Sequence, residues 1–142
     1  MIALVVLGIL AAVLVPGMRE FVVAQRVRAL ANDLATDLML ARSEALKRNA
    51  TAQLVAATGG HQSGWVVSAG ALVLGWRGAT GSGIVVDGAV TSITFNASGR
   101  MTAPNTQLRM TVRPQGSSPY AAARCVELDL SGRVRTQAGT CT

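Results

Sequence analysis

The chain has 142 residues, which suffices for a single domain with its own hydrophobic core. Half of the residues are hydrophobic but only 4% are aromatic, so the core must consist mainly of Val, Leu, Ile and Ala. The charged share is 14%, well below the roughly one quarter that is usual in a soluble domain, which excludes a chain that faces water along its whole length.

The net charge is +6, and the excess of basic residues lies in the last third of the chain. Residues 1–49 carry a net charge of +2 and residues 50–98 carry none, whereas residues 99–142 hold six arginines against two carboxylates. Such an excess attracts polyanions such as nucleic acid, acidic lipids or acidic glycans. A purely solubilising role of the charge is the alternative interpretation.

Residues 1–15 form a run, MIALVVLGILAAVLV, without a charged or strongly polar side chain. As a helix the run would be about 22 Å long, shorter than the roughly 30 Å hydrocarbon core of a bilayer. It lacks the basic start and the small-x-small cleavage site of a secretory signal. We therefore expect that a short segment is missing before Met1.

Residues 16–49 are predicted to form an amphipathic helix. Apolar residues recur there at helical spacing, at Phe21, Val27, Leu30, Leu34, Leu38, Ala41 and Ala45. Lys47 and Arg48 would suit the negative end of the helix dipole. Pro16 and Gly17, at the start of this segment, are expected to kink the helix or to melt it locally.

From residue 50 to residue 142 the pattern changes to short, β-branched runs separated by Gly, Ser, Asn and Pro. Typical runs are TAQLVAA, GWVVSA, GIVVDG, QLRMTVR and RCVELDL. A helix followed only by strands predicts an α+β fold, in which an antiparallel sheet packs on the helix.

The order of these segments resembles that of type IV pilins and of the pseudopilins of type II secretion. Those chains have an apolar run, a proline and an amphipathic helix, as in ALVVLGILAAVLVP and ARSEALKRN here. ITFNASGRMT and the late CVELDLSGRVR are similar to the minor-pilin subgroup that includes GspH, FimT and FimU. The resemblance implies the pilin fold and association with other pilin subunits through the N-terminal helix. It also implies that the protein resides in the inner membrane and periplasm before it joins a surface pilus.

No constellation of residues indicates catalysis or a cofactor. His61 is the only histidine, and its glycine-rich surroundings, GGHQSGW, offer no nucleophile and orienting carboxylate at a recognisable spacing. GWRGATGSG matches no phosphate-binding loop. With one histidine and no Cys-x-x-Cys spacing, a metal site is not expected either. We therefore expect a protein that is not an enzyme and that holds no cofactor.

The two cysteines, Cys125 and Cys141, enclose the last segment of the chain. They are compatible with two free thiols or with a disulfide, which would imply an oxidising compartment. A bridge would close a loop of about fifteen residues and stabilise the fold by roughly 3 kcal/mol. In that loop, an extended chain would place Arg133 and Arg135 on one side and Val134 on the other.

Two arginines on one side of a strand present paired N–H donors that match phosphate oxygens. Gly132 would let a backbone approach closely and leave an amide free for a ligand. Arg100, Arg113 and Arg124 are candidate extensions of the same basic patch. Aromatic side chains for stacking on bases are scarce, with only Tyr120 nearby, so we expect contact with a DNA backbone without reading of its sequence.

GRVR at residues 132–135 matches the GRxR motif that is associated with the binding of incoming DNA in FimT-like pilins of competent bacteria. The resemblance thus implies a minor pilin that binds extracellular double-stranded DNA for natural transformation. Two alternatives stay open. The arginines could form ordinary surface ion pairs with Glu127 and Asp129. The chain could also be an assembly subunit, either a structural minor pilin or a GspH-like pseudopilin of type II secretion, that does not bind DNA.

Overall fold

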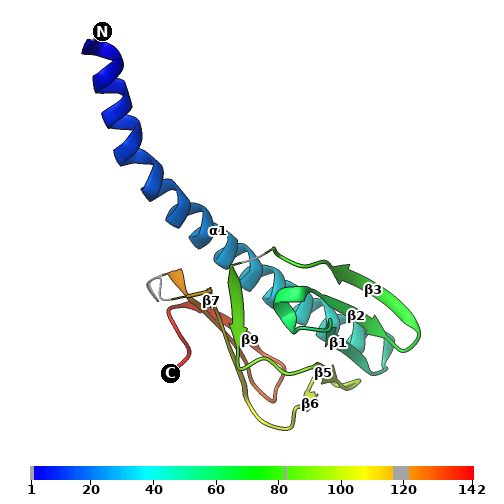
Figure 1. Cartoon of the computed structure of the whole chain (residues 1–142). Coiled ribbons are helices and arrows are strands. Elements are labelled where there is room, and N and C mark those ends of the chain that lie inside the picture. The colour runs from blue at the N-terminus through cyan, green and yellow to red at the C-terminus, as the bar shows by residue number, and fades with distance from the viewer. Residues whose placement is uncertain (1, 82, 117–121) are drawn as a thin grey trace.

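The computed structural model describes residues 2–81, 83–116 and 122–142, and for residues 2–17 and 19 it describes the backbone alone. The helix α1 (Ile2–Arg48) is followed by strands and by the short 3₁₀ turn η1 (His61–Ser63). The C-terminal half of α1 is wrapped by the strands, while its N-terminal half projects away from them (Figure 1). The α+β class with a long N-terminal helix, predicted from the sequence, is confirmed.

The strands form two antiparallel sheets that both contact α1. The five-stranded sheet has the order β3-β2-β1-β5-β6, and the four-stranded sheet has the order β4-β7-β8-β9. The strand bounds are β1 (Ala52–Ala56), β2 (Trp65–Ala69), β3 (Leu72–Arg77), β4 (Ile84–Asp87), β5 (Ser92–Phe95), β6 (Met101–Ala103), β7 (Leu108–Pro114), β8 (Arg124–Leu128) and β9 (Val134–Ala138). The edges β6 and β9 therefore belong to different sheets.

One face of α1 supplies the centre of the core. Leu30, Leu34 and Leu38 are at most 1% exposed, and they pack in one cluster with residues of both sheets such as Phe95 and Met110. Burial of each such side chain contributes about 1.5–3 kcal/mol. Because these leucines recur at helical spacing, the amphipathic pattern alone fixes which face of the helix the sheets cover.

The predicted helix differs from the observed one at two places. Phe21 is 61% exposed, because the face covered by the strands begins only at Val27. The helix also continues through Pro16 and Gly17, so the expected local melting is wrong. A proline removes one backbone hydrogen bond, and the remaining turns of a long helix keep their own. Within the described residues, no helix combines the length and the hydropathy needed to cross a membrane.

A polar contact fixes the hairpin β2–β3 to the helix. The Asp37 carboxylate accepts hydrogen bonds from Trp65 Nε1 at 2.8 Å and from Arg77 Nε at 2.9 Å. Asp33, one turn earlier, lies 3.2 Å from Arg77 Nη1. The hydrogen bond to Asp37 is the main reason why the pKa of Arg77 is raised. Arg77 is thus held by two carboxylates of α1.

Candidate nucleic-acid interface

The hairpin β8–β9 carries the arginines that the sequence singled out. Its strands pair from Arg124 opposite Ala138 to Leu128 opposite Val134, and residues 129–133 form the turn between them. Gly132 N donates to Asp129 O at 2.9 Å, and Asp129 N donates to Arg133 O at 3.2 Å. This is a tight turn that ends in a left-handed glycine, with Gly132 at φ 79°. It fixes the backbone directly before Arg133.

Arg133 and Arg135 both face solvent, whereas Val134 between them packs against the core. The predicted alternation is therefore confirmed. Within the described residues, neither guanidinium group has an ion pair or a side-chain hydrogen bond. Two unpaired cations thus stand on the same exposed stretch of chain.

The two nearest carboxylates have other partners. Glu127 lies opposite Arg135 in the sheet, but its Oε1 is 3.7 Å from Arg109 Nε. Asp129 Oδ1 accepts the Ser131 hydroxyl and the backbone N–H of Arg133, the latter at 3.1 Å. The Ser131 hydrogen bond is the largest cause of the lowered pKa of Asp129, followed by the backbone N–H of Arg133. Ion pairs with the arginine side chains, the alternative interpretation of these residues, are absent from the described contacts.

The end of the chain is fastened across the same sheet. Cys125 and Cys141 form a disulfide, with their Cα atoms 5.0 Å apart. Cys141 N donates to Thr111 Oγ1 at 3.1 Å, and Arg109 Nη1 donates to Thr142 O. The tail after β9 therefore returns to β7 and β8, and the loop that holds the two exposed arginines is closed.

Gly132 has a different role from the expected one. The expectation of a free amide is wrong, because Gly132 N–H is bonded to Asp129 O. The backbone that approaches closely is the protein's own: a Cβ on Gly132 would lie 2.2 Å from Gly99 O. Gly132 is also buried. It thus shapes the turn that presents Arg133.

The three candidate extensions lie in different places. Arg100 is exposed and is the last residue of the turn at residues 96–100. That turn touches the turn at residues 129–133. Arg113 donates to the Asp87 carboxylate on β4.

Arg124 lies farther away. Its strand partner is Ala138, four residues beyond Val134, so Arg124 lies roughly 13 Å along the hairpin from the turn. Of the three, only Arg100 is next to Arg133. Tyr120, the expected aromatic neighbour, lies outside the described residues.

Nothing in the remaining described side chains resembles a catalytic or metal centre. His61 is fully buried, neither ring nitrogen has a hydrogen-bond partner, and burial lowers its pKa. Within the described residues, no three His, Cys, Asp or Glu side chains gather as a metal ion would require.

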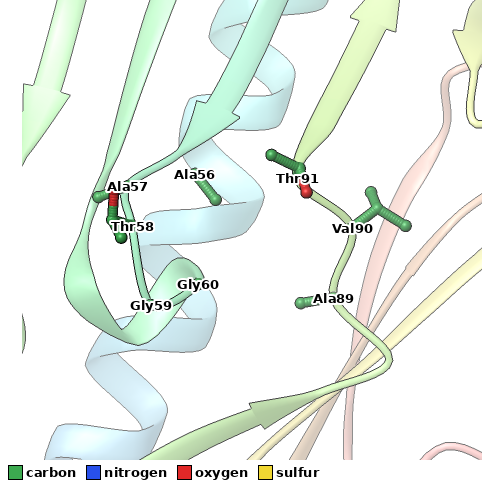
Figure 2. Close-up of a pocket in the computed structure, with 8 residues that line it drawn as sticks. All are labelled: Ala56, Ala57, Thr58, Gly59, Gly60, Ala89, Val90 and Thr91. Carbon is green, nitrogen blue, oxygen red and sulfur yellow. The ribbon is translucent and has the colours of Figure 1, made fainter.

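A cavity of about 310 Å³ lies between the loop after β1 and the segment before β5 (Figure 2). Its lining, Ala56, Ala57, Thr58, Gly59, Gly60, Ala89, Val90 and Thr91, carries no charge.

A profile of the family described as "Type II transport protein GspH" matches residues 30–132, which is most of the chain. The chain belongs to the GspH family. It is thus a minor pilin or pseudopilin of a type IV pilus or a type II secretion system. Membership implies that it associates with other pilin subunits in a filament. No curated protein sequence matches this GspH-family chain significantly.

Solved structures share the fold. The type IV minor pilin FimU of Pseudomonas aeruginosa is similar with a TM-score of 0.66 at 20% identity, over 80% of this chain and 89% of that one. A second crystal form of FimU gives a TM-score of 0.64 at 21% identity, over 78% and 91% of the two chains. The minor pseudopilin EpsH from the type 2 secretion system of Vibrio cholerae gives 0.59 at 15% identity, over 80% and 97%.

Proposed function

We propose that this GspH-family protein is a minor type IV pilin that binds extracellular double-stranded DNA through its C-terminal arginines during natural transformation. The observation that carries the proposal is the exposure of Arg133 and Arg135 without a carboxylate partner among the described residues. The disulfide and the turn hydrogen bonds keep the stretch that bears them in place. Binding needs no catalysis, so we propose a receptor and not an enzyme.

The chemistry of the site favours phosphate. A guanidinium group presents planar N–H donors that fit phosphate oxygens, and an unpaired one does not have to break an ion pair before it binds. Among the described aromatic residues, Trp65 and Phe95 are buried and Trp76 lies on the other sheet, so stacking on bases is not supported here. Contact is therefore with the DNA backbone and independent of sequence. We propose that the protein resides in the inner membrane and periplasm first, and in the cell-surface pilus when it meets DNA.

A DNA titration of the full chain in non-ionic detergent, at about 50 mM and about 200 mM salt, tests the proposal. We expect a slope of log affinity against log salt of about −2 to −4, as a handful of phosphate contacts gives. In Arg133→Gln with Arg135→Gln, we expect affinity on the order of 100-fold lower at the lower salt and a slope about 2 units shallower.

The matched control is Arg26→Gln with Arg28→Gln. These two arginines are also exposed, and their loss removes the same charge from the distant helix. The control should bind as the wild type does. No binding by the wild type, or equal losses in the two double variants, would overturn the proposal.

A second candidate function is filament assembly without DNA binding. It is favoured by the edge strand β3, where Val73 is 59% exposed and Trp76 is 74% exposed. Large apolar side chains on an unpaired edge are suited to a neighbouring subunit. Under this alternative, Trp76→Ser would weaken the association with other minor pilins in a co-purification, and DNA would not bind at either salt concentration.

A further inference from the structure

Two turns in different sheets share one sequence pattern. Asn96-Ala97-Ser98-Gly99-Arg100 joins β5 to β6, and Asp129-Leu130-Ser131-Gly132-Arg133 joins β8 to β9. Both read Asx-x-Ser-Gly-Arg. A pattern repeated in two distant parts of the chain predicts that both turns have the same backbone geometry.

The two turns also share their hydrogen bonds. In each, the glycine N–H donates to the backbone oxygen of the Asx residue, at 2.9 Å in both cases. In each, the Asx side-chain oxygen accepts the serine hydroxyl and the arginine backbone N–H, the latter at 3.0 Å for Arg100 and 3.1 Å for Arg133. Arg100 and Arg133 therefore leave equivalent turns at equivalent positions.

The turns pack against each other beside the C-terminal part of α1. Met101 N donates to Leu130 O at 3.2 Å, and a Cβ on Gly132 would collide with Gly99 O. Arg42 of the helix lies under both glycines: its Nε donates to Gly99 O at 3.0 Å. The same Nε would be 2.9 Å from a Cβ on Gly132.

This contact gathers positive charge. Arg100 and Arg133 each directly follow a glycine of the contact, and both are exposed. Among the described contacts neither side chain has a partner, and Arg42 uses only its Nε. The Asp129 carboxylate accepts the hydrogen bonds of its own turn, and its charge attracts Arg133 without forming an ion pair with it. Three arginines thus belong to one contact between the two turns and the helix.

We propose that Arg100 and Arg133 form one composite phosphate-binding site across the edges of the two sheets, with Arg42 as the charge beneath it. The ligand is the phosphate backbone of double-stranded DNA, so the inference rests on the proposed function and adds a second turn to it. Two guanidinium groups on a shared rigid base can hold neighbouring phosphates of one strand without rearrangement of the chain. The motif GRVR accounts for only one of these two turns.

The test compares single variants of the full chain in the same titration. Arg100→Gln should lower affinity about as much as Arg133→Gln, on the order of 10-fold at about 50 mM salt, and make the salt slope shallower by about 0.9. Arg100→Lys keeps the charge and should retain most of the slope. Arg124→Gln is the matched control, because it removes one described arginine that lies at the far end of the same hairpin.

The outcomes separate the two proposals. If Arg133→Gln weakens binding while Arg100→Gln behaves as Arg124→Gln does, the composite site is overturned and DNA binding stands. If the wild type binds no DNA, both are overturned. Because the Arg100 side chain has no described contact, its loss should leave thermal unfolding unchanged, and circular dichroism checks this.

Discussion

Two hairpins at the edges of different sheets use arginine in opposite ways. In β2–β3, Arg77 at the end of β3 is held by Asp33 and Asp37 of the helix, and the same strand exposes apolar side chains such as Trp76. In β8–β9, the carboxylates are occupied by other partners, while Arg133 and Arg135 stand without an ion pair in the described part of the chain.

The difference shows that the partners of a charge, more than its sign, determine what a surface can bind. The first arginine is a structural cation that fastens a strand to the helix. The second pair is free to meet an external anion, and a disulfide takes over the fastening. The two hairpins are therefore held in place by different contacts. Four changes to the chain, given from the largest expected effect on stability to the smallest, test this contrast.

The largest effect is expected at Gly132. Gly132→Ala would place a methyl group 2.2 Å from Gly99 O in a backbone with φ 79°. Strain and overpacking together should lower the free energy of unfolding by about 3–4 kcal/mol. Gly139→Ala is the control, since Gly139 has φ 93° but nothing within 4 Å of its Cβ position, and it should cost about 1 kcal/mol. Denaturant unfolding measures both, and equal losses would contradict the packing of the two turns.

Removal of the disulfide should come next. Cys125→Ala with Cys141→Ala should lower the free energy of unfolding by about 3 kcal/mol, because the bridge closes a loop between residues 16 positions apart. The same loss should appear when the wild type is unfolded in the presence of a reducing agent. A double variant as stable as the oxidised wild type would show that the tail needs no bridge.

The helix contact of the first hairpin should matter less. Asp37→Ala would leave Trp65 Nε1 and Arg77 Nε without their acceptor, at a cost of about 2 kcal/mol. Asp33→Ala removes an exposed ion pair only and should cost about 0.5 kcal/mol or less. Thermal unfolding of the two variants separates these roles. Equal costs would mean that Asp37 acts as a surface charge alone.

The smallest effect is expected from His61, in the turn that precedes β2. Burial lowers its pKa in the folded state, so below pH 6.5 the unfolded chain binds more protons than the folded one. The free energy of unfolding should therefore decrease as the pH falls below about 6.5, and His61 should not affect it at pH values well above that. His61→Phe should remove this decrease.

Other groups titrate in a different range. The carboxylates with lowered pKa values, Glu44 and Asp129, lose their contribution to the free energy of unfolding only at lower pH. An equal decrease in the variant would assign the effect to another group.

The sequence predicted those features that depend on local pattern. The helix end at Arg48, its buried leucine face and most strand runs follow from periodicity and from turn residues. The outward direction of Arg133 and Arg135 follows from strand alternation. These features need no knowledge of distant residues.

Features that depend on long-range contact could not be predicted in this way. The link from Asp37 to Trp65 joins residues 28 positions apart, and the link to Arg77 spans 40. Strand β6 has only three residues, too few to show alternation. The contact between the two glycine turns was also missed, because the repeated Asx-x-Ser-Gly-Arg pattern predicts two similar turns but does not indicate that they touch.

The length of α1 determines how far the arginines stand from the start of the chain. Arg42, beneath the two turns, lies forty residues after Ile2, which corresponds to about 60 Å along a helix. If neighbouring subunits enclose the N-terminal part of this helix, the turns would lie outside the enclosed part. The length of the helix thus sets how far the turns stand from the N-terminal part of α1.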